Sequence, residues 1–223
     1  MRNMVAVFAF FILLAACKKG AMEEQRTPVY SEANYQITVT GKWNANDFNV
    51  PAGVHFTLLA GVVHNNELTI WRQGALASKN LEYIAENGNS APLLAEVDSL
   101  VRLDKALAKI AAAAPPPNGS SVFTTKANTN YFLLSFASML APTPDWFFGS
   151  PALPLYRNRS WVKDTTVQLY AYDAGTEEGD VFGYNNSATY PQQLIALLST
   201  ANASVLFRGT VLPIAEMRIQ KQE

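Results

Sequence analysis

Hydrophobic and polar residues alternate along several segments of the chain, which is the pattern of half-buried β-strands. The clearest example runs from Tyr35 to Thr40, where tyrosine, isoleucine and valine occupy every second position. Asn65 and Asn66 separate two apolar segments and predict a hairpin turn. Further strands are predicted at 56–63, 68–71, 122–125, 130–139, 165–172, 204–212 and 216–220.

Helical periodicity is strong in only one segment. From Leu93 to Ala114 apolar residues recur every three or four positions, and three consecutive prolines follow from Pro115. Shorter helical turns are predicted at 81–86 and 191–198. Because no repeat and no change of composition divides the chain, the pattern predicts one all-β, mostly antiparallel domain with one or two connecting helices.

The N-terminal segment has the pattern of a processing signal. Arg2 precedes an uninterrupted apolar run from Met4 to Ala16, which is shorter than the roughly 20 residues of a membrane-spanning helix. Cys17, the only cysteine of the chain, follows directly. This arrangement resembles the lipobox of bacterial lipoproteins, although an ordinary signal peptide with an incidental cysteine is the alternative.

We therefore expect three parts: a signal peptide at 1–16, an acylated cysteine and flexible tether at 17–31, and a folded domain at 32–223. Several acyl chains on Cys17 would anchor the protein to a membrane. The expected location is the bacterial cell envelope, and Lys18 after the cysteine favours the outer membrane. Which face of that membrane carries the domain is left open.

Composition excludes some functions. The chain has 223 residues, 49% of them hydrophobic, and a formal net charge of -1, so it lacks the basic field of a nucleic-acid-binding protein. With one cysteine it forms no internal disulfide. It also contains no Gly-x-Ser-x-Gly elbow, no phosphate loop and no Cys–His pair, so no conventional nucleophile is visible and we expect a protein that is not an enzyme.

Two acidic segments carry the most informative chemistry. Asp145 follows two prolines that keep the chain from being helical, and three aromatic residues come after it. Asp173 and Glu177 flank Gly175 in a loop that can direct both carboxylates at one point. Such oxygen ligands suit Ca²⁺, which takes about six to eight of them. Alternatively, Asp173 only caps a turn, and the loop carboxylates are solvated.

Other candidate residues have both a functional and a structural interpretation. Trp146, Phe147 and Phe148 form a binding surface if they are exposed beside the metal, and otherwise they belong to the core. His55 and His64 suggest zinc or acid–base chemistry, but structural hydrogen bonding is favoured because their odd separation places them on opposite faces of a continuous strand.

Two motifs resemble those of the spondin N-terminal domain, the module of F-spondin and mindin. The family's Pro-Ser-Pro-Asp-Trp-Phe run matches Pro142–Phe147, and its Asp-Ala-Gly-Thr-Asp loop matches Asp173–Glu177. The resemblance extends from about Tyr35 to near the end of the chain, except for 92–126, which has no family motif. Upstream matches occur in order at Tyr35, Trp43, Pro51, His55, Phe56, His64, Trp71, Gly74, Ala77, Ser78, Leu81 and Ala85–Gly88.

The resemblance implies an antiparallel β-sandwich similar to C2 domains, with a site for one divalent cation. Its ligands would be Asp145, Asp173 and Glu177, where the last replaces the usual aspartate and moves the carboxylate outward. The implied function is that of a calcium-binding domain that mediates adhesion to, or recognition of, an extracellular protein or glycan. The alternatives are a structural envelope lipoprotein without a specific ligand and a metal-dependent hydrolase of the cell envelope. The hydrolase would need Glu178, Asp180 or a histidine as a base beside the metal.

Overall fold

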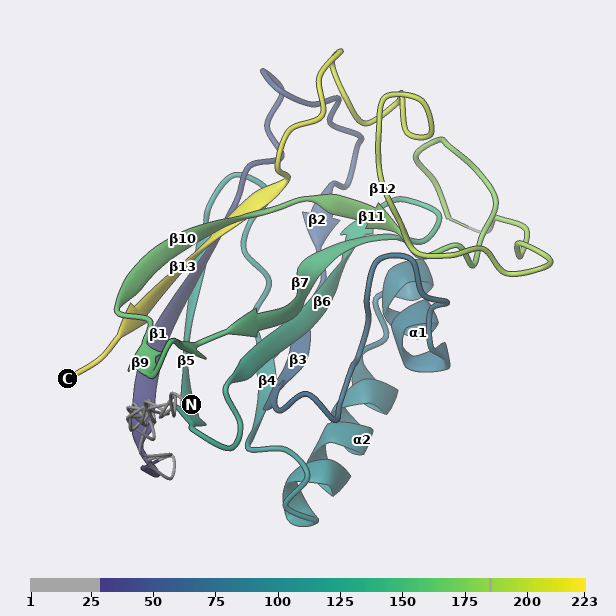
Figure 1. Cartoon of the computed structure of the whole chain (residues 1–223). Coiled ribbons are helices and arrows are strands. Elements are labelled where there is room, and N and C mark those ends of the chain that lie inside the picture. The colour runs from purple at the N-terminus through teal and green to yellow at the C-terminus, as the bar shows by residue number, and fades with distance from the viewer. Residues whose placement is uncertain (1–28, 185) are drawn as a thin grey trace, which may run out of the picture.

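The computed structural model describes residues 29–184 and 186–223; the predicted signal peptide and Cys17 lie outside these residues. Two antiparallel sheets pack face to face, and two helices cover the outer face of the larger sheet (Figure 1). This arrangement confirms the predicted all-β sandwich. The smaller sheet has the strand order β10 (Asp164–Leu169), β13 (Ala215–Lys221), β1 (Glu32–Gly41) and β5 (Ser120–Asn128).

The larger sheet supplies both the centre of the molecule and the candidate site. Its strand order is β12 (Ala196–Leu197), β11 (Ala171–Asp173), β7 (Trp146–Pro154), β6 (Leu133–Ala141), β3 (Leu59–His64) and β4 (Ala108–Ala112). Beside this path, β2 (His55–Phe56) pairs with β6, and β8 (Tyr156–Arg157) forms a separate hairpin with β9 (Ser160–Trp161). Neither helix of the described ranges has the length and apolar composition to cross a membrane.

The alternating sequence of β1 explains the first hydrophobic core. Tyr35, Ile37 and Val39 all point inward and are fully buried between the sheets, where they share one cluster with Phe136 and Phe148 of the larger sheet. All nine residues of β6 are buried, because this strand has the smaller sheet on one side and the helices on the other. Its nearly continuous apolar sequence follows from that position.

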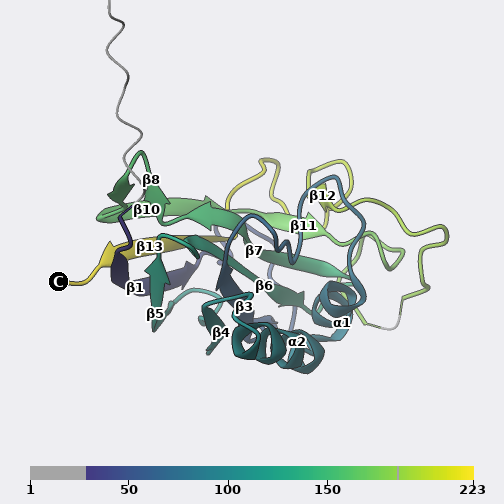
Figure 2. The same ribbon diagram turned by 60° about the horizontal axis from the view of Figure 1, so that its bottom comes forward.

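The second core lies between the larger sheet and the helices α1 (Lys79–Asn87) and α2 (Ala91–Arg102), which lie side by side beneath it in Figure 2. Ile84 and Val97 pack there against Val62 and Phe147. The side chain of Ser78 accepts a hydrogen bond from the backbone of Leu81 at 3.3 Å and caps α1. The turn predicted at 81–86 is therefore a full nine-residue helix.

The long helix predicted at 93–114 is wrong in its second half. Helix α2 ends at Arg102, Asp104 turns the chain with φ 53°, and β4 then pairs with β3. In β4 the burial alternates, with Ile110 and Ala112 inward. The alanine-rich segment has a helical pattern, but pairing with the edge of β3 satisfies its backbone and buries Ile110, so tertiary contacts override the local preference.

Other predicted elements also differ from the structure. Segment 204–212 forms no strand and has only an isolated bridge between Phe48 and Phe207. Segment 68–71 forms no strand either, so the hairpin predicted at Asn65 does not form. Instead, β3 pairs with β4 and β6. Trp71 is buried as a core side chain against Phe147, which explains its apolar surroundings without a strand. The segment 191–198 contains the short strand β12 in place of a helical turn.

The remaining strand predictions are confirmed in position. Segments 35–40, 122–125, 130–139 and 216–220 lie within or largely within β1, β5, β6 and β13. Segment 56–63 is divided between β2 and β3, and segment 165–172 between β10 and β11. The second break transfers the chain from the smaller sheet to the larger one at Tyr170, which brings Asp173 to the edge of β7.

Candidate cation site

The strand pairing of β7 and β11 brings two distant aspartates together. Asp145 directly precedes β7, and Asp173 is the last residue of β11, where it pairs with Trp146. The backbone N–H of Ala174 donates to the backbone oxygen of Asp145 at 3.2 Å. Residues 28 positions apart in the chain are therefore neighbours at one end of the larger sheet.

Asp145 is fully buried and its two carboxylate oxygens differ. Oδ2 accepts hydrogen bonds from the backbone N–H of Thr176 at 2.7 Å, that of Glu177 at 3.0 Å and the hydroxyl of Thr176 at 3.1 Å. Oδ1 is buried without a hydrogen-bond partner among the described residues. Burial raises the pKa of this carboxyl group, although the hydrogen bonds from Glu177 and Thr176 oppose the shift. A buried, unpartnered carboxylate oxygen suits a cation.

Asp173 is the second acidic group of this site. Its Oδ1 accepts a hydrogen bond from the backbone N–H of Gly175 at 2.7 Å. Gly175 has φ 73°, and a Cβ there would lie 2.4 Å from the backbone oxygen of Gln193, so the turn requires glycine. Burial, and then the charge of Asp145, raises the pKa of Asp173 to about 6. A cation beside these aspartates would relieve both effects.

Glu177 lies at the margin of this pair. Its backbone is bound by Asp145, while its Oε2 accepts from the amide of Asn186 at 3.5 Å. Burial, and then the charge of Glu86, raises its pKa. Among residues 29–184 and 186–223, no three His, Cys, Asp or Glu side chains are arranged to hold one ion. The structure thus brings together Asp145 and Asp173 but leaves the third predicted carboxylate apart.

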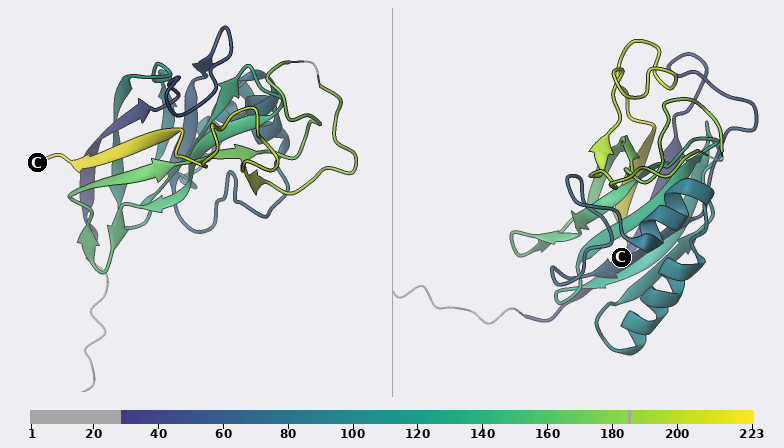
Figure 3. Two further views of the ribbon diagram at one scale, coloured as in Figure 1. Left: turned by 90° about the horizontal axis from the view of Figure 1, so that it is seen from above. Right: turned by 90° about the vertical axis from the view of Figure 1, so that its right-hand side faces the viewer.

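Two hollows of about 400 Å³ each flank Glu177 and Thr189. Asp173, Glu178 and Asp180 line one of them, and Glu82, Glu86 and Tyr190 line the other. The loop that forms them extends beyond the ends of the strands (Figure 3). Glu86, which lines the second hollow, was not among the predicted site residues. No pattern in the sequence indicated its position, because α1 and the acidic loop lie far apart in the chain.

The three aromatic residues after Asp145 form no surface. Trp146, Phe147 and Phe148 are each 0% exposed, so of the two interpretations the core is confirmed and the binding surface is wrong. Strand β7 is covered on both faces, and its side chains alternate between them. Trp146 and Phe148 enter the core between the sheets, whereas Phe147 packs on Trp71 with ring centroids 4.9 Å apart.

The two histidines make structural hydrogen bonds, as predicted. His64 is buried, which lowers its pKa, and its Nε2 lies 2.7 Å from the hydroxyl of Ser135. It pairs with Leu133, at the opposite end of β6 from Asp145. His55 lies 2.8 Å from the backbone oxygen of Gly53 and lines neither hollow beside Glu177. Within the described residues, neither histidine therefore lines the hollows beside the acidic loop.

Comparisons with known proteins agree with this fold and these motifs. The chain is 30% identical to human Spondin-2 over 181 residues, which cover 77% of this chain and 54% of Spondin-2. It is 29% identical to rat Spondin-1 over 180 residues, which cover 75% of this chain and 22% of that protein. The chain thus spans about half the length of Spondin-2. The Spondin_N family model matches residues 33–208, and this chain therefore belongs to the Spondin_N family.

Proposed function

We propose that this protein is a calcium-binding recognition module, held at a bacterial cell envelope by a lipid on Cys17, whose acidic loop end binds an extracellular protein or glycan. The main support for a bound cation is that the buried Oδ1 of Asp145, which lies beside Asp173, has no hydrogen-bond partner among the described residues. The buried carboxylate of Asp145 and the half-buried one of Asp173 are neighbours that repel each other, and both have raised pKa values. A divalent cation removes this repulsion.

Asp145 and Asp173 would hold the cation, and Glu177 would contribute from the margin. Calcium suits this donor set because it accepts carboxylate, carbonyl and water oxygens in flexible geometry. When bound, the ion would supply a positive charge that attracts carboxylate or hydroxyl oxygens of a partner. The chain itself positions the loop, since Asp145 binds the backbone of Thr176 and Glu177.

The loop after Asp173 has the composition of a binding surface. Val181, Tyr184, Tyr190 and Leu194 are 56%, 51%, 95% and 55% exposed. Exposed apolar patches with a polar rim are typical of interaction sites, and aromatic residues are enriched in interfaces. These side chains take the part that the sequence assigned to Trp146, Phe147 and Phe148.

The hydrolase alternative receives less support from the same residues. It requires a positioned base beside the metal, but His64 lies at the opposite end of β6 from Asp145, and His55 does not line the hollow beside Asp173. Glu178 and Asp180 line the hollow but are exposed. A purely structural lipoprotein does not account for the exposed loop residues.

Calcium binding is tested by thermal unfolding with and without millimolar calcium chloride. We expect calcium to raise the Tm of the parent and to have no effect on Asp145→Asn or Asp173→Asn, while Glu177→Gln responds at higher concentration. Glu67→Gln, an exposed carboxylate in a turn outside the site, is the matched control and keeps the full shift. A parent Tm that does not respond, or an equal response in Asp173→Asn, would contradict the site.

Recognition is tested by screening extracellular matrix proteins and glycans with the parent in calcium and in chelator. We expect a calcium-dependent binder whose binding is lost in Tyr190→Ala and kept in Tyr156→Ala, which changes a tyrosine outside this loop. Binding that is equal in chelator would contradict a role for the cation. Binding that is indifferent to Tyr190 would contradict the loop surface.

The lipid anchor is tested independently in a bacterial host. Metabolic labelling with a radioactive fatty acid should label the parent and leave Cys17→Ser unlabelled. Envelope fractionation should then find the parent with the membrane. An unlabelled parent would show that Cys17 is an incidental residue of an ordinary signal peptide.

A further inference from the structure

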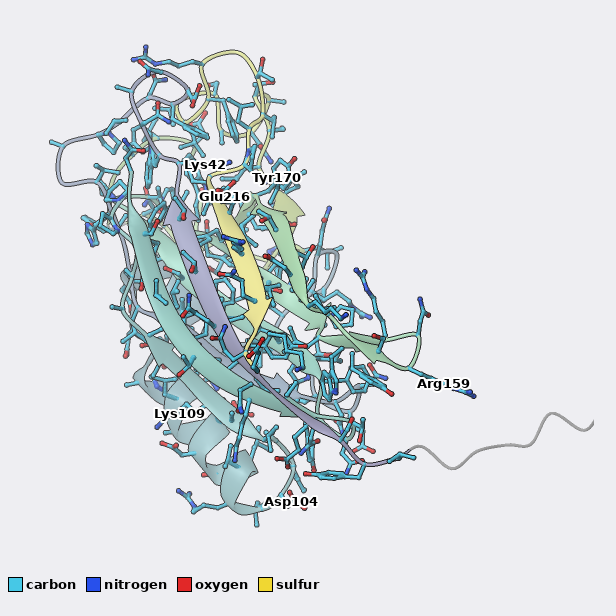
Figure 4. The ribbon with its side chains drawn as sticks, turned by 90° about the vertical axis from the view of Figure 1, so that its left-hand side faces the viewer. Lys42, Asp104, Lys109, Arg159, Tyr170 and Glu216 are labelled. Carbon is cyan, nitrogen blue, oxygen red and sulfur yellow. The ribbon has the colours of Figure 1, made fainter. Side chains whose placement is uncertain are left out.

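A group of cations occupies the end of the molecule opposite the acidic loops. Arg157, Arg159, Lys163 and Lys221 are all exposed, and we call these four residues the basic end. Arg157 and Arg159 come from the β8–β9 hairpin, Lys163 directly precedes β10, and Lys221 is the last residue of β13. Figure 4 shows Arg159 projecting from the body of the molecule, far from Tyr170 at the other end of β10.

The hairpin holds Arg159 in an unfavourable backbone conformation. Asn158 has φ 52° and Arg159 has φ 59°, as in two-residue turns of type I′. Asparagine tolerates its position, but the second position strongly favours glycine, because a Cβ is strained in the left-handed region. An arginine in this position points to a use for its side chain that outweighs the strain.

The basic end also has concave surface that can receive an anionic group. A hollow of about 480 Å³ is lined by Arg159, Trp161, Lys163 and Lys221 among others, and a neighbouring one of about 300 Å³ by Arg157 and Lys163. The acids that line the two hollows are Asp164 and Glu223. Asp164 is paired with Arg218 at 2.7 Å, whereas no ion pair within the described residues involves the basic end.

This end is also where the described domain begins. The indole of Trp161 donates to the hydroxyl of Ser31 at 3.1 Å, and the backbone N–H of Gln222 donates to the oxygen of Asn34 at 2.8 Å. Val29 and Tyr30 are 81% and 57% exposed here. Aromatic and apolar side chains mixed with lysine and arginine are typical of protein surfaces at a membrane interface.

The strands separate the basic end from the candidate cation site. The chain passes through β10 and β11 from Asp164 to Asp173, which at about 3.3 Å per residue is roughly 30 Å. A surface bound at the basic end would therefore leave the acidic loops free. It would also keep them away from the negative charge of that surface.

We propose that the basic end binds an anionic phospholipid membrane, and so orients the domain with its acidic loops directed outward. Four cations near such a surface attract its phosphate groups, and this attraction would add to that of the lipid proposed on Cys17. The proposal goes beyond the recognition function and does not require calcium. A soluble anionic polymer is the rival partner, but it gives no reason for the exposed Val29 and Tyr30 at the same end of the molecule.

The test measures partition of the full chain onto vesicles of phosphatidylcholine alone and of phosphatidylcholine with one part in three phosphatidylglycerol. Apolar segments contribute equally to both, so the difference isolates charge. We expect the parent to bind the anionic vesicles more strongly than the neutral ones, and salt to weaken this binding. In Arg157→Gln/Arg159→Gln, binding to the anionic vesicles should be roughly tenfold weaker. The matched control Arg72→Gln/Arg208→Gln removes two exposed cations elsewhere and keeps the binding.

A second variant separates folding from binding. Arg159→Gly relieves the strained turn, so it should raise the Tm while it weakens binding to the anionic vesicles. Equal partition onto both vesicle types, or equal losses in the two double variants, would overturn the proposal. Heparin serves as a soluble anionic polymer for comparison. If Arg157→Gln/Arg159→Gln loses binding to heparin but binds vesicles as the parent does, the proposal is overturned in favour of a soluble polymer.

The calcium site and the basic end fail separately in these experiments. Vesicle binding should be the same in chelator and in Asp145→Asn, because that residue lies at the other end of the sandwich. A protein that does not respond to calcium but still binds anionic vesicles would refute only the recognition function. Chelator-sensitive vesicle binding would overturn the assignment to the basic end.

Discussion

At the scale of single residues, the two carboxylate oxygens of Asp145 have different surroundings. Oδ2 organises the acidic loop through three hydrogen bonds, and Oδ1, which has no hydrogen-bond partner among the described residues, is the atom that we propose binds a cation. The sequence motifs singled out Asp145 and Asp173, and the pairing of β11 with β7 makes them neighbours; that they bind a cation stays a prediction. The motifs did not locate Glu177 relative to the pair, because its side-chain position depends on how the loop folds back.

The hydrogen bonds of Asp145 predict a graded loss of stability. Asp145→Ala leaves buried N–H groups of Thr176 and Glu177 without an acceptor, and we expect a loss of about 2–4 kcal/mol in the free energy of unfolding. Asp145→Asn keeps one acceptor oxygen and should lose less. Denaturant unfolding in chelator measures both. Equal stability of the alanine variant and the parent would contradict the role of Oδ2.

Asp173 predicts a pH effect that opposes the usual acid behaviour. Its pKa rises from 3.8 to about 6 on folding, so the folded state binds a proton more tightly than the unfolded state. Stability from this group is present below pH 4 and is lost as the pH rises through 6, by roughly 2–3 kcal/mol.

The measurement for Asp173 is the stability difference between the parent and Asp173→Asn in chelator, followed from pH 4 to pH 7. We expect the free energy of unfolding of Asp173→Asn to increase relative to that of the parent as the pH rises, because the asparagine does not ionise. A constant difference across this range would show that Asp173 is not perturbed. Calcium should reduce the difference above pH 6, because it stabilises the ionised parent.

At the scale of elements, close strand packing depends on glycines as well as on apolar residues. Gly61 of β3 lies opposite Phe136 of β6, and a Cβ there would lie 2.0 Å from the backbone oxygen of Ser135. Because the obstacle is backbone in a central strand, it cannot move aside. The alternating patterns of β1, β5 and β13 were sufficient to predict those strands, whereas this close approach leaves no pattern in the sequence.

Gly61→Ala therefore has a large expected effect. We expect a loss of about 3 kcal/mol or more, or failure to fold, as for other strongly overpacked positions. Gly183→Ala is the control, because a Cβ at Gly183 meets nothing within 4 Å. Purified yield and the Tm measure both variants. A Gly61→Ala protein as stable as the control would contradict the tight pairing of β3 with β6.

At the scale of the whole molecule, the larger sheet joins two hydrophobic cores. Phe136 faces the core between the sheets, and the next residue, Ala137, faces the helices. The three layers should therefore unfold together, because neither core remains intact without the shared sheet. The same layering leaves opposite ends of the sandwich exposed, one acidic and one basic.

Cooperativity is tested by a substitution in one layer and a signal from the other. Ile84→Ala removes a buried side chain of α1, and we expect a loss of about 2–5 kcal/mol. In a Trp71→Phe background, the remaining tryptophans 43, 146 and 161 report on the core between the sheets. The denaturation midpoint measured by their fluorescence should fall by as much as the full loss of stability in Ile84→Ala requires. An unchanged midpoint would mean that the helices unfold independently of the core between the sheets. The control is Leu103→Ala, because Leu103 is exposed.

The sequence by itself determined the strands with period-two alternation, the all-β class, and the two acidic motifs, because these depend on interactions between near neighbours in the chain. Only the tertiary structure decided that 108–112 is a strand and that Trp146, Phe147 and Phe148 are core. It also decided that Asp145 meets Asp173 with Glu177 aside, and that four cations gather near Ser31. These features depend on which strands pair and which faces are covered, and both are set by contacts between distant residues.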